Sequence, residues 1–277
     1  MTRRDPLARA LRYGLLTLLA VVFLVPFYLI VRNALMTDRQ ITAPGWAWLP
    51  TTPRWDNFAK LFTDPSGAML TGLENSAVIA VVTLVLQMLF SSMAGYALAR
   101  IPARGRNVVF FLILSTLMIP SAVTFVPTFA VMAYLGGVNT RWGIIAPGLF
   151  SAFSIFLFRQ FYLRFPAEVE EAGRLDGLGY FGIYRYLLLP NSTSILMALG
   201  VLTFIGSWNS FLWPLVIGQD PSAWTVQVVL STFLTSQTIN LSQLFAAAAV
   251  GVAPLVIVFL LMQRHIVEGA KFSGGKE

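Results

Sequence analysis

The chain has 277 residues, of which 57% are hydrophobic and only 11% charged. Soluble domains carry about 25% charged residues, so this composition excludes a water-soluble protein. The net charge of +7 comes from basic residues in short loops, a pattern typical of membrane topology and not of a nucleic-acid surface. The absence of cysteine excludes disulfides and thiolate metal sites.

A transmembrane helix needs about 20 apolar residues to cross a hydrocarbon core about 30 Å thick. Six segments are long and apolar enough, so the sequence predicts an all-α integral membrane bundle, a single domain over residues 1–277. The predicted spans are residues 13–32, 76–98, 108–135, 143–161, 195–217 and 244–263. The first run also resembles a signal peptide, but its length and the lack of a clear cleavage site favour a retained helix.

The distribution of basic residues predicts the orientation of the spans. One set of loops and both terminal segments hold Arg3, Arg4, Arg9, Arg12, Arg100, Arg104, Arg106, Arg159, Arg164, Arg174, Arg185, Arg264, Lys271 and Lys276. The opposite loops hold only Arg39, Arg54, Lys60 and Arg141, with Arg32 at a helix end. Because basic residues concentrate on the cytoplasmic side, we expect both termini and the segment 166–190 to be cytoplasmic.

Two further features of the predicted spans and loops bear on the architecture. The external loop 36–72 is rich in Trp and Pro, which fits an aromatic belt at the membrane interface and also fits a surface for an external protein. Pro120 and Pro127 both fall within the predicted span 108–135. Since proline removes a helical hydrogen bond, we expect that span to be bent or broken.

Several kinds of chemistry are missing from the sequence. No charged residue lies near the middle of a predicted span, which argues against a proton-coupled carrier, because such proteins usually need buried ionisable groups. The glycine-rich end of the chain does not match a nucleotide-binding P-loop. We therefore expect no catalytic residues, no metal site and no cofactor bound by this chain. If transport is active, a partner supplies the energy.

The sequence of segment 166–190 predicts a helix, a sharp turn and a second helix. Pro166 and the acidic residues after it suit the first turn of a helix. Glu170 and Arg174 are four residues apart and are expected to pair. Gly177 can adopt the left-handed conformation that ends a helix. Taken alone, this pattern also fits an ordinary amphipathic loop helix.

The pattern within this segment resembles a known signature. Glu171-Ala172-Gly173, Leu175-Asp176-Gly177, Arg185 and Leu188-Leu189-Pro190 are similar to the EAA motif of membrane permease subunits of binding-protein-dependent ABC importers. Here Gly173 replaces the second alanine, and the spacings to Gly177 and Pro190 are kept. Asn75-Ser76, GYALAR at 95–100, MIP at 118–120 and WNSFLWPL at 208–215 resemble the carbohydrate-uptake branch, of the maltose and glycerol-phosphate type.

The resemblance implies a six-helix permease of a bacterial or archaeal cytoplasmic membrane that passes a carbohydrate across it. It implies a second permease subunit, two ATPase subunits that use ATP and Mg, an extracytoplasmic solute-binding protein and the lipid as partners, with no nucleic acid. Segment 166–190 would be the ATPase-coupling loop. The residues that the resemblance assigns to the coupling are Glu170, Glu171, Ala172, Gly173, Asp176, Gly177, Arg185, Leu189 and Pro190.

A few polar and aromatic residues within the spans are candidates for the substrate path. Trp208, Asn209 and Trp213 could stack on a sugar ring and bond its hydroxyls, and Gln87 is a further polar candidate. Each of these could instead hold helices together. Two other functions stay open: an ATPase-independent carrier or channel for a small polar solute, and a membrane scaffold. Neither needs the loop 166–190.

Overall fold

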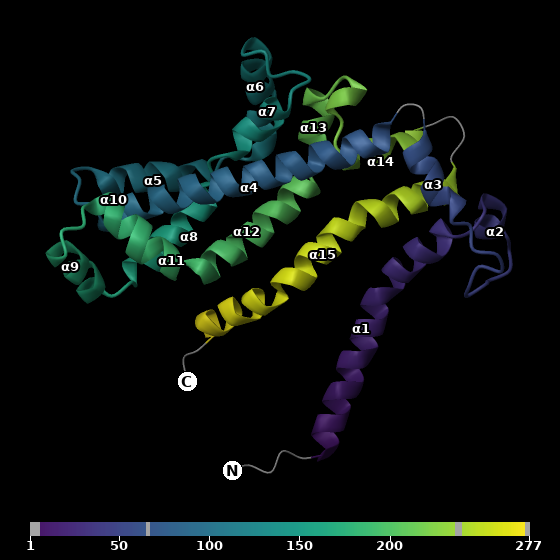
Figure 1. Ribbon diagram of the computed structural model, residues 1–277, viewed down its shortest axis with the longest axis horizontal. Coiled ribbons are helices and arrows are strands. Elements are labelled where there is room, and N and C mark those ends of the chain that lie inside the picture. Colours follow the sequence, from purple (N-terminus) through teal and green to yellow (C-terminus); the bar gives the residue numbers. More distant parts are fainter. Residues whose placement is uncertain (1–5, 65–66, 236–239, 275–277) are drawn as a thin grey trace. The chain divides into compact units, whose positions relative to one another are not determined.

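The structure is a computed structural model that describes residues 6–64, 67–235 and 240–274. Every regular element in this described part is a helix (Figure 1). The chain divides into two units: one holds residues up to Met69 with Val229–Ala253, and the other holds Leu70–Val228 and the chain from Pro254. Arg3, Arg4 and Lys276, which helped to predict the orientation, lie outside the described residues.

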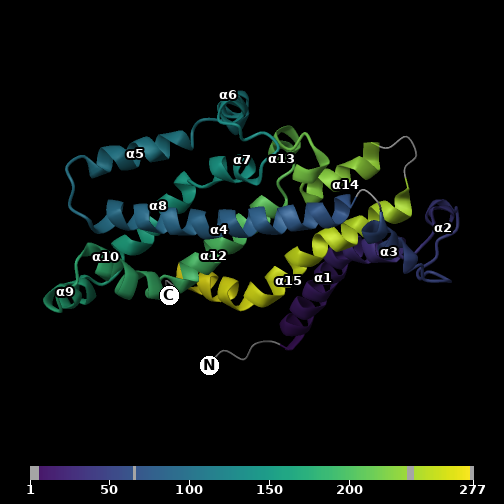
Figure 2. The same cartoon turned by 45° about the horizontal axis from the view of Figure 1, so that its top comes forward.

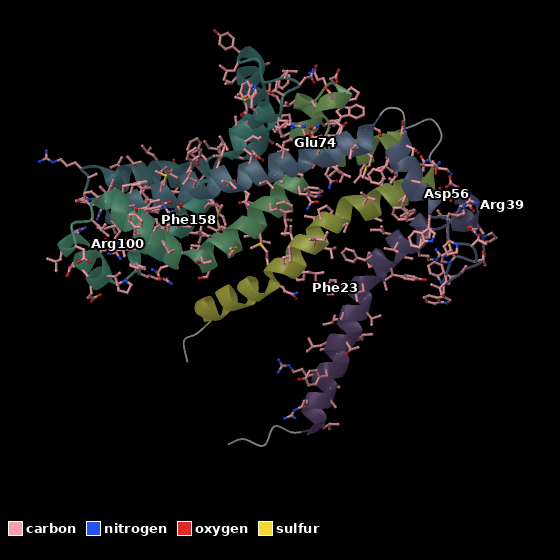
Figure 3. All side chains as sticks on the ribbon, in the orientation of Figure 1. Phe23, Arg39, Asp56, Glu74, Arg100 and Phe158 are labelled. Carbon is pink, nitrogen blue, oxygen red and sulfur yellow. The ribbon has the colours of Figure 1, made fainter. Side chains whose placement is uncertain are left out.

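The first unit is built on a long apolar helix and two short polar ones. Its elements are α1 (Pro6–Ala34), α2 (Asp38–Thr42), α3 (Asp56–Thr63) and the first part of α15 (Leu241–Gly274). Apolar side chains along α1, such as Phe23 (Figure 3), are exposed, as expected of a helix that faces lipid. Asn57 of α3 donates to the carbonyls of Ala34 and Met36, both at 2.9 Å, which fixes the chain after α1.

The second unit is organised around α4 (Ala68–Arg100), a continuous helix of 33 residues. The remaining elements are α5 (Arg106–Thr116), α6 (Ser121–Tyr134), α7 (Arg141–Ile145), η1 (Ala146–Gly148), α8 (Ala152–Leu163), α9 (Ala167–Leu175), α10 (Tyr180–Gly182), the π-helix η2 (Ile183–Leu188), α11 (Leu189–Asn191), α12 (Thr193–Trp208), α13 (Leu212–Ile217), η3 (Pro221–Ala223) and the end of α15 from Pro254. Helix α14 (Val226–Thr235) begins in this unit, and its part from Val229 belongs to the first unit. Helices α9 and α10 gather at the Arg100 end of α4 (Figure 2). This end of the unit therefore carries the segment 166–190.

Within the described residues, three helices are long and apolar enough to cross a membrane: Arg9–Ala34, Ala68–Arg100 and Leu241–Gln263. Three helix pairs reach this length and hydropathy only if each pair is taken as one bent span. They are Arg106–Thr116 with Ser121–Tyr134 (99°), Arg141–Gly148 with Ala152–Leu163 (46°) and Tyr180–Asn191 with Thr193–Trp208 (76°). The 99° bend separates α5 from α6, so the predicted break in residues 108–135 is confirmed. It falls at Pro120, whose extended backbone precedes α6.

Two other predicted spans are also interrupted. Residues 143–161 bend by 46° where η1 meets α8, because Pro147 and the capping Ser151 end one helix and start the next. Residues 195–217 hold two helices, since α12 ends at Trp208 and α13 begins at Leu212. Pro214 lacks the N–H that would bond the Ser210 carbonyl, so a continuous helix is disfavoured there.

The main core of the second unit lies near the Arg100 end of α4. Phe158 and Tyr162 of α8 are fully buried there, against Tyr96 of α4 and Leu188 of η2. Helices α4 and α8 cross closely, because a Cβ placed on Gly95 would lie 2.5 Å from Cβ of Phe158. The segment 166–190 is thus packed onto the helices through a dense aromatic core.

Candidate functional site

A cavity of about 500 Å³ lies within the second unit, between α4, η1, α8, α12 and α13. This volume is within the about 300–1,000 Å³ of typical small-molecule sites. None of its lining residues is charged. Its polar lining residues are Thr83, Gln87, Ser151, Ser154, Thr203, Ser207 and Ser210, with Trp213 at one side. Such a lining offers hydroxyl and amide groups to a polar solute and no ion pair to a charged one.

Gln87 is the most connected polar residue of the cavity. Its Nε2 donates to Oγ of Ser154 at 3.2 Å and to Oγ1 of Thr203 at 3.3 Å, so one amide joins α4, α8 and α12. Both N–H groups are then used, and the described residues place no donor on Oε1. The amide oxygen is available as an acceptor for a solute hydroxyl.

The structure brings only two of the four predicted path residues into this cavity. Gln87 and Trp213 line it, and Nε1 of Trp213 donates to the Gly143 carbonyl at 3.2 Å. Trp208 is 3% exposed and stacks on Phe204, outside the lining. Asn209 accepts from Gln227 at 3.3 Å and is also outside it.

The hydroxyl residues of the lining were missed by the sequence reading. Serine and threonine are common in membrane helices, where they often bond their own backbone. Their position on the cavity side follows from the packing of α4, α8 and α12, which one sequence does not reveal. The usable signal was the polar face shared by Thr83 and Gln87, four residues apart on one helix.

The other end of α4 is fixed by a polar network. Nδ2 of Asn75 donates to the carbonyls of Ser222 at 2.9 Å and Trp224 at 2.8 Å. The guanidinium of Arg141 reaches Oδ1 of Asn75 at 2.7 Å and Oε1 of Glu74 at 2.6 Å. The network ties α4 to α7 and to the chain around η3.

The chain beside this network holds an acid with a shifted pKa. Hydrogen bonds from Ser222, including its backbone N–H at 2.9 Å, hold the pKa of Asp220 below its usual value. The backbone N–H of Asp220 donates to Oδ1 of Asn139 at 2.8 Å. Two separate loops are therefore joined next to the end of α13.

The segment 166–190 forms the predicted helix, turn and helix. Helix α9 ends at Leu175, and Gly177 has φ +83°, so the predicted left-handed stop is confirmed. The N–H groups of Gly177 and Leu178 bond back to the carbonyls of Arg174 and Gly173, as at a typical glycine C-cap.

The expected pairing of Glu170 with Arg174 is wrong. Glu170 is 4% exposed and points inward, where its Oε1 lies 3.0 Å from Nε of Arg100. Arg174 instead lies 5.7 Å from the ring of Tyr180. The burial of Glu170 explains the difference, because a buried carboxylate needs a buried cation.

The other coupling-loop candidates divide between two faces. Gly173 is buried, and a Cβ there would lie 2.6 Å from Cδ1 of Leu187, so this glycine lets the two halves of the segment pack together. Glu171, Ala172, Asp176, Gly177, Arg185 and Pro190 are exposed, and Leu189 is half-buried. Three large side chains beside them are also exposed: Leu175 at 89%, Phe181 at 69% and Tyr186 at 67%.

No group of three or more His, Asp or Glu side chains that could hold a metal ion occurs among the residues described. The candidate site therefore consists of two parts of the same unit. One is the uncharged cavity beside Gln87, and the other is the exposed, partly apolar loop at the Arg100 end of α4. This arrangement can admit a polar solute and contact another protein.

The chain is similar to several known proteins. The family described as binding-protein-dependent transport system inner membrane component matches residues 87–271. The arabinooligosaccharides transport permease AraQ of Halalkalibacterium halodurans is 39% identical, over 82% of this chain and 81% of its own length. The lactose transport permease LacG of Rhizobium radiobacter is 32% identical over 97% of each chain.

Two further relatives extend the comparison. The sn-glycerol-3-phosphate transport permease UgpE of Yersinia pestis is 33% identical, over 90% of this chain and 91% of its own. A chain in the crystal structure of a bacterial ABC transporter that imports alginate has the same fold, with a TM-score of 0.83 and 24% identity over 95% of this chain and 98% of that one. The chain therefore belongs to the family of inner membrane components of binding-protein-dependent transport systems.

Proposed function

We propose that this chain is one of two permease subunits of an ATP-driven importer and that it forms part of the path for a neutral carbohydrate. The uncharged, hydroxyl-lined cavity around Gln87 carries this proposal. Sugars bind through many hydrogen bonds to neutral groups, which this lining offers. The similarity to permeases for arabinooligosaccharides and lactose supports a carbohydrate substrate.

The topology we propose has six spans with both termini in the cytoplasm. Three continuous helices and the bent pairs α5 with α6 and α7–η1 with α8 support five spans among the described residues. The sixth would run through α12, because the Tyr180–Asn191 part of its bent pair belongs to the segment that we place in the cytoplasm. Arginines concentrated around Arg100–Arg106 and in 159–185 support the orientation, since basic loops stay in the cytoplasm. The external ends of α4 and α7 then carry the Glu74–Arg141 network, on the side where a solute-binding protein delivers the sugar.

The coupling we propose runs through the segment 166–190. Its exposed Leu175, Phe181 and Tyr186 support a protein partner, because large apolar side chains in water mark interaction surfaces. The exposed Glu171 and Arg185 supply polar anchors beside them. The partners are two ATPase subunits, which bind and hydrolyse ATP with Mg, and this chain is a transport subunit and not itself an enzyme.

Affinity purification of the tagged chain in mild detergent, followed by mass spectrometry and reconstitution with its binding protein, tests the proposal. We expect an ATPase and a second permease to co-purify. We also expect uptake of radiolabelled arabinotriose or lactose to require ATP, with glycerol 3-phosphate not taken up. Recovery of this chain alone, or sugar uptake that does not need ATP, would contradict the proposal.

A further inference from the structure

Arg100 joins three parts of the chain at the end of α4. Its Nε–H donates to the Tyr162 carbonyl at the end of α8, at 2.9 Å. Its terminal NH2 group donates to the Phe165 carbonyl just before α9. Its Nε also lies 3.0 Å from Oε1 of Glu170 within α9. The guanidinium is therefore hydrogen-bonded to the end of α8 and to the chain before α9. Its contact with Glu170 is electrostatic, since the single Nε–H is used by Tyr162 and Oε1 of Glu170 accepts no hydrogen bond from the described residues. Arg100 thus brings α4, α8 and α9 together by two hydrogen bonds and one ion pair.

Glu170 differs from the other acids of α9 in facing the protein interior. Its side chain is 5% exposed and that of Arg100 is 17% exposed, whereas Glu168 and Glu171 are exposed. Removing one partner from such a pair leaves a buried charge without compensation. The position of Glu170 thus serves the inside of the permease and not the exposed face of the loop.

The second half of the loop is tied to α4 by two further hydrogen bonds. The hydroxyl of Tyr96 donates to the Tyr180 carbonyl at 3.1 Å. Oγ of Ser92 and the hydroxyl of Tyr184 lie 2.8 Å apart in the core. The rings of Tyr96 and Tyr184 are stacked, with centroids 5.6 Å apart. Both halves of the loop are therefore bonded to the same helix.

Helix α4 connects this joint to the cavity. Arg100 follows Gln87 by thirteen residues on the same unbroken helix, a distance of about 20 Å at 1.5 Å per residue. Figure 3 shows Arg100 at one end of α4, with Glu74 toward the other. A displacement of the loop that moves α4 as a rigid rod also moves Gln87, and with it the bonds to Ser154 and Thr203.

We propose that Arg100 and Glu170 are positioning residues that join the coupling loop to α4 and α8 as one rigid body, so that movement of the loop is delivered to the Gln87 wall of the cavity. This inference rests on the proposed function, because an ATPase must move the loop. In this scheme the exposed residues of the loop contact the partner, and the buried ion pair transmits the movement.

Distance measurements between spin labels test the rigid joint in the purified, reconstituted complex. This chain contains no cysteine, so within it labels attach only at Val85→Cys, 54% exposed on α4, and Ala167→Cys, exposed at the start of α9. Partner subunits without reactive cysteines are used. In the otherwise unchanged protein, we expect the same mean distance in the ATP-free and vanadate-trapped states. In Glu170→Gln and Arg100→Met, we expect the distribution to broaden or shift with nucleotide.

The controls separate this joint from general damage. Arg104→Met removes a nearby exposed arginine and should keep the wild-type distribution. Tyr96→Phe removes only a hydroxyl and should broaden the distribution even if the charge variants fail to assemble. The inference is overturned if the wild-type distance changes between the two states, or if Tyr96→Phe and every assembled charge variant keep the wild-type distribution. A complex without an ATPase would overturn the proposed function, and this inference with it.

Discussion

Asn75 joins three parts of the second unit through a single side chain. Its amide donates to two carbonyls on either side of Ala223, and its oxygen accepts from Arg141. The residue is 1% exposed, so water cannot replace these bonds. A buried polar group left without a partner costs about 1–3 kcal/mol. The conformation of the chain between η3 and α14 therefore depends on this one amide.

Asn75→Ala is expected to destabilise the protein by about 1–3 kcal/mol, because the carbonyls of Ser222 and Trp224 lose their shared donor in a part-buried site. The measurement is the midpoint of thermal unfolding in detergent, followed by intrinsic fluorescence. Asn191→Ala is the matched control, since Asn191 is exposed and makes one bond, to the Leu187 carbonyl. Equal midpoints for the two variants would show that the Asn75 network contributes little.

The lowered pKa of Asp56 in α3 leads to a prediction about stability at low pH. Hydrogen bonds from Arg54 and Lys60 lower its pKa to about 2, from about 3.9 in an unfolded chain. Because the folded pKa is the lower one, the stabilisation is fully present above about pH 4 and is lost as the pH falls toward 2. A ¹³C-carboxyl NMR titration in micelles should show this midpoint. Arg54→Gln should move it up toward the ordinary value, and an unmoved midpoint would contradict the assignment.

At the scale of elements, the crossing of α4 and α8 depends on one glycine. A Cβ on Gly95 would lie 2.5 Å from Cβ of Phe158 and 2.9 Å from the backbone nitrogen of Arg159. Neither atom is the flexible end of a side chain, so even alanine forces the two helices apart. The aromatic core beneath the segment 166–190 would lose contacts as a consequence.

Gly95→Ala is therefore expected to lower the yield and the thermal midpoint of the folded protein. Gly206→Ala in α12 is the matched control, because a Cβ at Gly206 meets nothing within 4 Å. There alanine should be neutral or stabilising, by up to about 1 kcal/mol, since it favours the helix more than glycine does. Thermal unfolding of both variants measures the difference. A Gly95→Ala protein as stable as wild type would show that the crossing can widen freely.

Signals within a short stretch of sequence predicted where helices break and end better than they predicted which side chains are in contact. The break before α6 and the stop at Gly177 were predictable, because proline and glycine act through the backbone of their own segment. The end of α12 was missed, although Pro214 was a signal for it. The inward direction of Glu170 could not be read from the sequence, since its neighbour Glu171 has the same chemistry. Only the packing of α9 on α4 brings Glu170 to Arg100.

At the scale of the whole molecule, the second unit places its two candidate functions on one helix. The loop is bonded to the Arg100 end of α4, and the cavity wall is formed by Thr83 and Gln87 of the same helix. The proposed function gives this arrangement a reason, because the chain would respond to an ATPase at the loop and to a solute-binding protein on the opposite side. If the proposed rigid joint holds, the chain needs no nucleotide site of its own to be driven by ATP.

A side chain that fills the cavity should reduce transport and leave the assembly of the complex intact. Gly206 lines the cavity, and a Cβ there meets nothing within 4 Å, so Gly206→Trp directs a large side chain into the open space. Import of radiolabelled lactose or arabinotriose into proteoliposomes is expected to fall at least about tenfold, because the added ring occupies the space and covers the hydroxyl groups. The loop 166–190 is untouched, so the ATPase should still co-purify and hydrolyse ATP.

The matched control for this substitution is Gly14→Trp. Gly14 lies on the exposed helix α1, where a Cβ also meets nothing within 4 Å. Import should continue there, since α1 contributes no residue to the cavity lining. If the Gly206→Trp complex assembles and imports sugar at the wild-type rate, the cavity is not part of the path. If it loses the ATPase as well, the substitution has disturbed the fold, and the smaller Gly206→Leu then decides whether the loss of import follows the filled volume.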